Sequence, residues 1–152
     1  MVVSHVLAGP RSGRRRRPHP AGRKKRSCTM STATIDLTAE TFSSTIESND
    51  IVLVDWWASW CGPCRMFAPI FDEAATKHPD LVFAKVDTEA QQELAGAANI
   101  RSIPTLMVFR ENVLVFSQAG ALPAHALDDL ISQVKALDMA KVHAAVAERQ
   151  GD

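Results

Sequence analysis

Two cysteines three residues apart, Cys61 and Cys64, are the residues best suited to carry chemistry, with Gly62 and Pro63 between them. They follow the apolar segment Ile51–Trp57, and a helix is expected from Cys61 onward. The first turn of a helix has free N–H groups and the positive end of the helix dipole, so it stabilises a thiolate. We therefore expect a lowered pKa for the Cys61 thiol. Cys64 should be shielded one turn deeper, and the pair can close a small disulfide ring in which one sulfur attacks and the other resolves.

Zinc binding is the competing interpretation, because the C-x-x-C spacing also occurs in zinc sites. A zinc ion would need two more ligands, and the only other cysteine, Cys28, lies in a basic N-terminal segment. The histidines His78, His125 and His143 are scattered without a ligand spacing. Pro63 suits the first turn of a helix, where its missing N–H costs nothing. The pattern favours a redox pair and predicts no metal site.

Alternating apolar segments and helical patterns predict the elements that position this pair. The expected strands are Thr34–Leu37, Ile51–Trp57, Leu81–Val86, Thr105–Phe109 and Val113–Phe116. The expected helices follow Thr38, run from Cys61 to about Lys77 with Pro69 inside, cover Glu89–Ala98, and run from Ala124 to about Glu148. Only residues 110–112 separate the last two strands, which favours an antiparallel hairpin. The order predicts an α/β fold with a mixed sheet.

The composition bounds the class of protein. The 152 residues are 46% hydrophobic and 22% charged, which fits one globular domain. The apolar runs are too short for a membrane helix, so we expect no membrane association. Three cysteines are too few for a small secreted domain held together by disulfides.

The net charge of zero hides a strong asymmetry. Nine of the 17 Lys and Arg residues and none of the 17 acidic residues lie in 1–30, so this segment carries +9 and the rest −9. The prolines and glycines there oppose the amphipathic helix of a transit peptide, and Ser4 and His5 interrupt the apolar start of a possible secretory signal. We expect a disordered basic tail, or translation assigned upstream of a true start at Met30. Nucleic-acid binding by Arg14–Arg17 and Arg23–Arg26 is less favoured, because no aromatic residue lies among them to stack on bases.

Residues 54–65, VDWWASWCGPCR, closely resemble the active-site segment of the thioredoxin family. The resemblance runs from about Thr34 to about Ala136 and includes Met66–Pro69, Ala84–Asp87, Ile103–Thr105 and Ala119–Ala121. It implies a thioredoxin fold, an α/β fold with a five-stranded mixed sheet and four flanking helices. In this chain the last helix is expected to extend through Met139–Gln150. We therefore divide the chain into a tail (1–30), a thioredoxin domain (31–137) and a helical extension (138–152).

The resemblance also implies a dithiol–disulfide oxidoreductase, with Cys61 as nucleophile and Cys64 as resolving thiol. Asp55 matches the family's buried aspartate behind the pair, and Lys85 matches its neighbour. From the sequence alone, Asp55 could instead cap the next segment, and Lys85 could be a solvated strand residue. Because Asp55 ends an apolar stretch, we expect burial to raise the pKa of its carboxyl group.

Other matched residues are expected to dock substrates beside the redox pair. Pro104 matches a cis-proline that faces the disulfide, so the Ile103–Pro104 peptide bond is expected to be cis. The implied docking set is Trp60, Gly62, Pro63, Ile103, Pro104 and Gly120. Trp57 and Pro69 are expected to support the site structurally, and Trp60 to be exposed. No cofactor is expected beyond the redox-active Cys61–Cys64 disulfide.

Departures from the family pattern leave partner preference open. Ser102 and Asn112 stand where the family often has glycine, and Trp56 replaces a more usual phenylalanine. Asparagine tolerates positive φ better than most residues, so Asn112 remains compatible with a tight hairpin.

The expected function is that of a cytoplasmic, monomeric protein-disulfide reductase, recharged by a thioredoxin reductase and serving electron transport and cell redox homeostasis. Its substrates would be disulfide-containing proteins. One alternative is a thioredoxin-fold binding subunit that needs no redox turnover. Another is an oxidase or isomerase of an oxidising compartment, against which the lack of a recognisable export signal argues.

Overall fold

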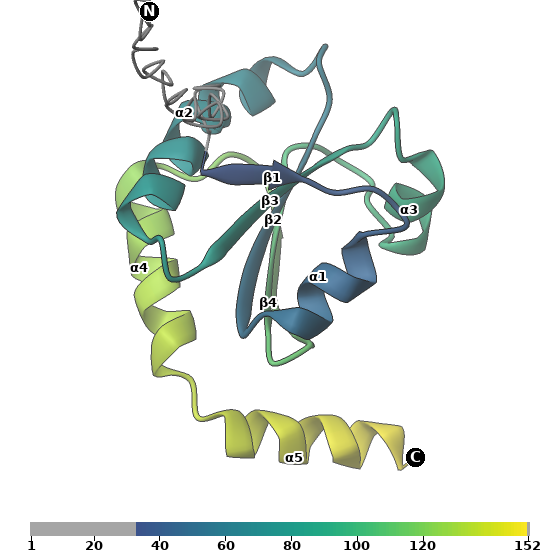
Figure 1. Cartoon of the computed structure of the whole chain (residues 1–152), viewed down its shortest axis with the longest axis vertical. Coiled ribbons are helices and arrows are strands. Elements are labelled where there is room, and N and C mark those ends of the chain that lie inside the picture. The colour runs from purple at the N-terminus through teal and green to yellow at the C-terminus, as the bar shows by residue number, and fades with distance from the viewer. Residues whose placement is uncertain (1–32, 152) are drawn as a thin grey trace, which may run out of the picture.

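Five strands form one mixed sheet in the order β1-β3-β2-β4-β5 (Figure 1). The computed structural model describes residues 33–151, so the expectations about the basic tail and Cys28 lie outside the described residues. β1, β3 and β2 are mutually parallel, whereas β4 is antiparallel to both β2 and β5. The strands are β1 (Thr34–Asp36), β2 (Ile51–Trp57), β3 (Val82–Asp87), β4 (Thr105–Arg110) and β5 (Val113–Ala119). All five predicted strands are confirmed, with ends shifted by three residues at most.

Helices cover both faces of the sheet. α2 (Gly62–Lys77) and α4 (Ala124–Ala136) lie on one face, and α1 (Phe42–Ser48) and α3 (Gln92–Ala97) on the other (Figure 1). α1 and α3 begin later than predicted; residues 38–41, for example, form a hydrogen-bonded turn before α1. No helix within residues 33–151 combines the length and apolar composition that crossing a membrane requires.

The central strand β2 sends its side chains alternately into two cores. Leu53 packs with Phe67 and Phe71 of α2 on one face, and Trp56 packs in the core on the other face. Asp55 is two residues after Leu53, and alternate residues of a strand point to the same face of the sheet. Its carboxylate therefore lies on the face covered by α2. An ionisable side chain is thereby buried within the apolar face of the sheet.

The prediction of one continuous helix from Ala124 to about Glu148 is wrong. α4 ends at Ala136, and a separate helix α5 (Met139–Gln150) follows, so the described part of the chain has five helices. The end of α4 is fixed by Arg110 of β4. Its Nη1 donates hydrogen bonds of 2.6, 3.1 and 3.0 Å to the carbonyl oxygens of Val134, Lys135 and Leu137. The last turn of a helix leaves carbonyl oxygens without their usual intrahelical partners, and Arg110 bonds to carbonyls in this region, where the Val134 oxygen also accepts the N–H of Leu137 at 3.3 Å.

A side-chain cap starts the new helix. The Asp138 carboxylate accepts hydrogen bonds from the backbone N–H groups of Ala140 and Lys141 at 3.1 and 3.4 Å, the usual N-cap arrangement. α5 then crosses the end of the molecule at which the β4–β5 hairpin lies (Figure 1). There His143 Nε2 is 2.9 Å from Glu111 Oε2. The hairpin turn places Glu111 and Asn112 at φ 49° and 63°, so the expectation for Asn112 is confirmed.

Candidate active site

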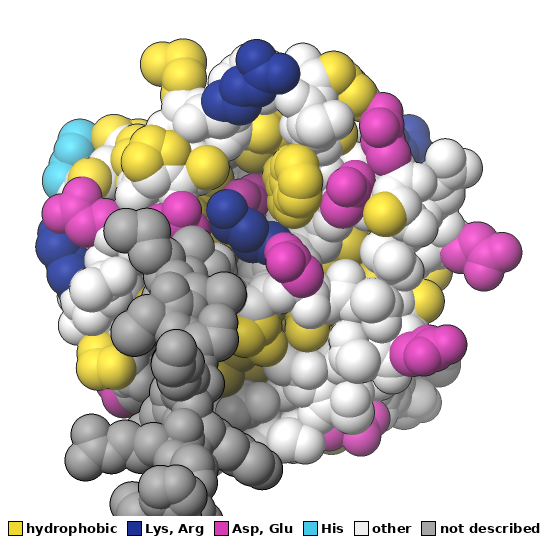
Figure 2. All heavy atoms as spheres, turned by 45° about the horizontal axis from the view of Figure 1, so that its top comes forward, with side chains coloured by type: hydrophobic (Ala, Val, Ile, Leu, Met, Phe, Trp, Pro, Cys, Tyr) yellow, Lys and Arg dark blue, Asp and Glu magenta, His cyan; other side chains and the backbone are white. Residues whose placement is uncertain are grey.

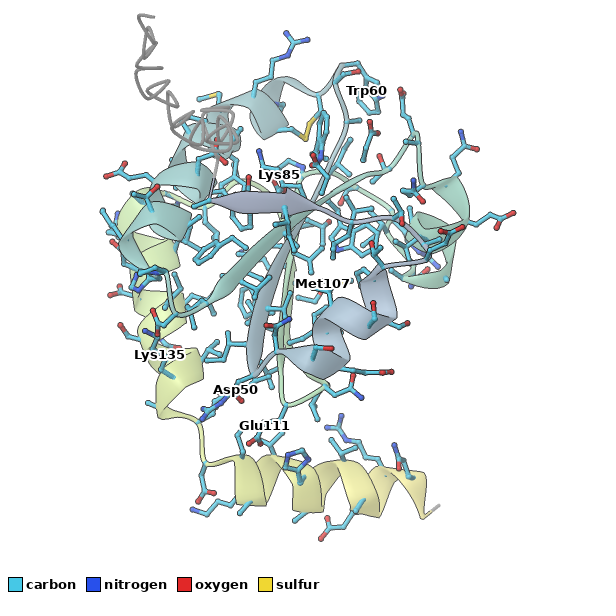
Figure 3. All side chains as sticks on the ribbon, viewed as in Figure 1. Asp50, Trp60, Lys85, Met107, Glu111 and Lys135 are labelled. Atoms are coloured by element: carbon cyan, nitrogen blue, oxygen red, sulfur yellow. A yellow bond between two sulfur atoms is a disulfide. The ribbon has the colours of Figure 1, made fainter. Side chains whose placement is uncertain are left out.

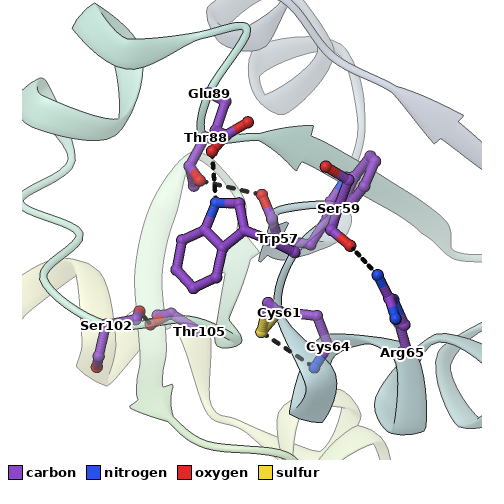
Figure 4. Close-up of a disulfide and its surroundings, with 10 residues drawn as sticks. Trp57, Ser59, Cys61, Cys64, Arg65, Thr88, Glu89, Ser102 and Thr105 are labelled. Atoms are coloured by element: carbon purple, nitrogen blue, oxygen red, sulfur yellow. Dashed lines mark hydrogen bonds between the residues drawn. A yellow bond between two sulfur atoms is a disulfide. The ribbon is translucent and has the colours of Figure 1, made fainter.

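The cysteine pair lies at the start of α2, as predicted. Cys61 is the N-cap residue, and a disulfide joins it to Cys64 with the two Cα atoms 5.2 Å apart. The backbone N–H of Cys64 points at Cys61 Sγ, 3.2 Å away (Figure 4). The sulfur of Cys61 therefore lies where free N–H groups and the helix dipole stabilise a thiolate after reduction. Pro63 occupies the first turn of α2, where it needs no N–H partner.

Burial alone does not distinguish the two cysteines, because each exposes only 3% of its surface in the disulfide form. Their positions do. Cys64 lines a pocket of about 230 Å³ beneath the helix start, together with Asp55, Trp57 and Lys85. Cys61 instead lies at the N-terminal end of α2, next in sequence to the exposed Trp60.

The Asp55 carboxylate is buried with one oxygen that accepts no hydrogen bond from the described residues. It is 1% exposed, and its Oδ1 has no hydrogen-bond partner among the described residues, which does not fit a capping role. Burial raises the pKa of Asp55 to about 7, while the positive charge of Lys85 opposes this rise and the negative charge of Asp72 adds to it. The predicted upward shift is confirmed in direction, with desolvation as its main cause.

Lys85 lies directly across the sheet from Asp55, in the paired position of β3. Its side chain is only 17% exposed, so it is not the solvated strand residue that the sequence also allowed. The ammonium group forms an ion pair with Asp72 of α2, at 3.5 Å. Asp72 was not identified from the sequence, since it is one of several polar residues on a helix predicted from its apolar positions.

Two tryptophans close to the cysteine pair in sequence, Trp60 and Trp57, have different surroundings, and Figure 4 labels Trp57 beside the disulfide. Trp60 is 65% exposed, as predicted, and its indole Nε1 donates a hydrogen bond to the Glu89 carboxylate. Trp57 is partly buried, and its carbonyl accepts hydrogen bonds from the backbone N–H and hydroxyl of Thr88 at 2.9 and 3.1 Å. Thr88 and Glu89 follow β3 and tie both tryptophans to the neighbouring strand. No sequence pattern pointed to them.

The Ile103–Pro104 peptide bond is cis, as the resemblance implied. The Pro104 carbonyl accepts a hydrogen bond of 2.7 Å from the N–H of Gly120, which holds φ +102°, a conformation that favours glycine. Ile103 and Trp60 line a groove of about 580 Å³ that continues toward α3.

Surface chemistry at this end is mixed. Figure 2 turns the end that carries Trp60 toward the viewer, and apolar, acidic and basic side chains are interspersed on it. Gly62 and Pro63 are exposed beside the disulfide. Pro69 lies farther along α2, exposed and inside a helix that continues past it. No group of three or more His, Cys, Asp and Glu side chains within the described part of the chain could hold a metal ion.

Comparison with known proteins decides the family. The protein-family model described as Thioredoxin matches residues 33–133. The chain belongs to the thioredoxin family. It is 58% identical over 119 residues to "Putative thioredoxin 2" of Streptomyces coelicolor, covering 78% of this chain and 89% of that protein. Against thioredoxin of Bacillus subtilis the identity is 38% over 102 residues, covering 66% and 97%.

Solved structures agree with this thioredoxin assignment. The structure of Plasmodium falciparum thioredoxin superposes with a TM-score of 0.61 at 36% identity, covering 66% of this chain and 97% of that one. A thioredoxin variant from Halobacterium salinarum gives 0.62 at 34% identity, covering 67% and 91%. The α/β thioredoxin fold is thus confirmed, and the Cys61–Cys64 disulfide is the redox-active pair of a dithiol oxidoreductase family.

Proposed function

We propose that this thioredoxin-family protein is a protein disulfide reductase in which Cys61 attacks and Cys64 resolves. The observation that carries the proposal is the division of surroundings within the pair. Cys61 Sγ lies at the helix end beside the backbone N–H of Cys64, whereas Cys64 shares a pocket with the buried Asp55. The first environment favours a thiolate, and the second offers a proton acceptor.

The reaction begins with attack by the Cys61 thiolate on a substrate disulfide, which forms a mixed disulfide and releases one substrate thiolate. Asp55 then accepts the Cys64 proton, directly or through water. The Cys64 thiolate attacks Cys61 Sγ, closes the Cys61–Cys64 disulfide and releases the second substrate thiolate. Two electrons pass from the protein dithiol to the substrate. A carboxyl group with a pKa of about 7 exchanges protons readily near neutral pH.

Thiol acidity accounts for little of the rate. The value known for thioredoxin itself is a nucleophile pKa of about 7, against about 8.5 for free cysteine. Adopting that family value raises the thiolate fraction at pH 7 roughly sixteenfold. Intrinsic nucleophilicity falls about fivefold over the same range, so the net gain is about threefold. Substrate docking and rapid closure by Cys64 must supply the rest.

Docking is assigned to the surface around the disulfide. Trp60 and Ile103 line the groove toward α3, and Pro104 and Gly120 are joined by a hydrogen bond beside it. Exposed Gly62 and Pro63 complete the surface. We assign recharging to a thioredoxin reductase and the working compartment to the cytoplasm, where thiols are kept reduced.

The test is reduction of insulin with dithiothreitol as electron source. Cys61→Ser should abolish catalysis. Cys64→Ser should still attack but accumulate mixed disulfides, detectable by mass spectrometry, because nothing resolves them. Cys28→Ser is the matched control and should retain full activity. Turnover of Cys64→Ser near the wild-type rate would show that the assigned roles are wrong, and a cellular function that survives Cys61→Ser would indicate a binding subunit.

A further inference from the structure

Lys85 lies near two carboxylates. The family resemblance makes it the neighbour of Asp55, but its ion pair is with Asp72. The residue paired with it in β2 is Asp55, but the carboxylate within 4.0 Å of its ammonium group is Asp72 of α2. Only 17% of the Lys85 side chain is exposed, and burying a charge is costly unless an opposite charge is paired with it. The position of its ammonium group is therefore set from α2.

Asp72 of α2 is the residue placed to set the position of the Lys85 ammonium group. Its side chain is 38% exposed overall, yet its Oδ1 is buried, has no hydrogen-bond partner among the described residues, and faces the Lys85 ammonium at 3.5 Å. The neighbouring charges of α2 are engaged elsewhere. Arg65 donates to the Ser59 carbonyl at 2.7 Å, and Glu73 pairs with Lys77 at 3.2 Å.

We propose that Asp72 is a positioning residue of the redox site, which holds the Lys85 ammonium toward α2 and so limits how far that cation neutralises the Asp55 carboxylate. A cation pulled toward one carboxylate stabilises the other less. Asp55 thereby keeps a proton affinity suited to exchange near neutral pH. The electrostatic inference concerns the oxidised protein as it stands, and only its catalytic consequence rests on the proposed function.

The charged and titratable groups around Asp55 support this assignment. β3 contributes Lys85, and α2 contributes Asp72, Arg65 and Cys64. β4 places the uncharged Leu106 opposite Asp55. β1 places Asp36 beside Lys85 in the sheet, but no ion pair joins them within 4.0 Å in the described structure. Asp72 is thus the carboxylate that competes with Asp55 for the cation.

The experiment is NMR titration of the Asp55 carboxyl carbon in the oxidised full-length protein. Asp72→Asn removes one negative charge and frees Lys85, and both effects stabilise ionised Asp55. The titration midpoint should fall by about one pH unit, a tenfold loss of proton affinity. Lys85→Gln should move the midpoint upward. Near-ultraviolet circular dichroism checks that each variant is folded.

Two comparisons separate positioning from a general charge effect. Glu73→Gln removes the adjacent carboxylate of α2, which is exposed and paired with Lys77, and should leave the midpoint unchanged. In the Lys85→Gln background, Asp72→Asn should produce less than about half of its effect, because the residue it positions is gone. An unchanged or higher midpoint in Asp72→Asn would overturn the proposal. So would an equal fall with and without Lys85, or an equal fall in Glu73→Gln.

The pH profile of mixed-disulfide resolution distinguishes this proposal from the function on which its consequence rests. If the profile shifts together with the Asp55 titration in Asp72→Asn, both are supported. If the titration moves and the profile does not, the positioning role stands and proton acceptance by Asp55 fails. If the titration does not move, the positioning role fails, whatever the fate of the Cys61→Ser test.

Discussion

At each end of the sheet a charged residue has one buried atom without a partner among the described residues, Oδ1 of Asp55 and Nε of Arg110, but the Nη1 of Arg110 donates to three carbonyl oxygens. Both residues project from the sheet face that α2 and α4 cover, Asp55 near the end of β2 and Arg110 opposite its start. Figure 3 shows the same division: Trp60 marks the redox end, and Glu111 marks the hairpin end near α5.

Under the proposed function, the difference separates a buried carboxylate assigned to proton transfer from a guanidinium that holds the end of a helix in place. A buried ionisable group with too few partners lowers stability, so its retention points to a function. A charge whose donors meet otherwise unpaired carbonyls stabilises the packing of an element. Changes at the two ends should therefore shift stability in opposite directions and with different pH dependence.

The largest effect is expected from Asp55→Ala in the oxidised protein. The pKa of Asp55 is about 7 when folded, against 3.8 as its ordinary value, so the native state binds the proton more tightly than the unfolded state. Ionised Asp55 then costs nothing below about pH 4, costs increasingly more as the pH rises, and reaches its full cost above about pH 7. Allowing for the lost packing, Asp55→Ala should gain about 2–4 kcal/mol at pH 8.

Urea unfolding at pH 4, 6 and 8 measures this gain, and resolution of the mixed disulfide should slow in the same variant. The gain should vanish near pH 4. A variant less stable than the wild type at pH 8, with unchanged resolution, would make Asp55 a structural residue and remove its assigned proton-transfer role.

Arg110→Met should have the next largest effect, with the opposite sign. The substitution keeps an unbranched side chain but removes the donor to Val134, Lys135 and Leu137. A loss of about 2 kcal/mol is expected, because the hydrogen bonds from a charged donor to these carbonyl oxygens are lost. Arginine stays protonated throughout, so the loss should be equal at pH 5 and pH 8. A loss confined to one of these pH values would contradict this account.

The two ends also differ in how far the sequence predicts them. The redox end follows from local order: an apolar strand, a cysteine pair, a helix start and a family motif. The strands, the buried Asp55, the exposed Trp60 and the cis bond before Pro104 were all predicted correctly. What sequence reasoning missed there is long-range, since Asp72 and Glu89 meet the site only through the packing of α2 and the turn after β3.

At the hairpin end, the helical spacing of apolar residues led to the wrong prediction of one continuous helix. Apolar residues recur at helical spacing through the break, so the pattern continues where the backbone does not. The interruption depends on Arg110, about 25 residues earlier in the chain, and on the capping carboxylate of Asp138. Aspartate within a helical pattern is ambiguous, since it is acceptable on an exposed helix face and favourable at an N-cap.

Asp138→Ala tests that capping role and should have a smaller, local effect. Loss of the two hydrogen bonds to the first turn of α5 should cost about 1 kcal/mol of helix stability. Amide hydrogen exchange should accelerate in α5 about fivefold and remain unchanged in α2. Ser132→Ala, on an exposed position of α4, serves as the matched control. Equal acceleration in both helices would mean that Asp138 supports the whole fold.

The smallest effect is expected where a charge is neither buried nor structurally required. Glu111 and His143 lie 2.9 Å apart, but their side chains are 44% and 49% exposed, so water and salt screen the pair. Glu111→Gln should change the free energy of unfolding by less than about 0.5 kcal/mol. Urea unfolding in low and high salt is the measurement. A loss above about 1.5 kcal/mol that disappears in high salt would show that this ion pair couples the hairpin to α5, and that the hairpin end, like the redox end, depends on a specific charge contact.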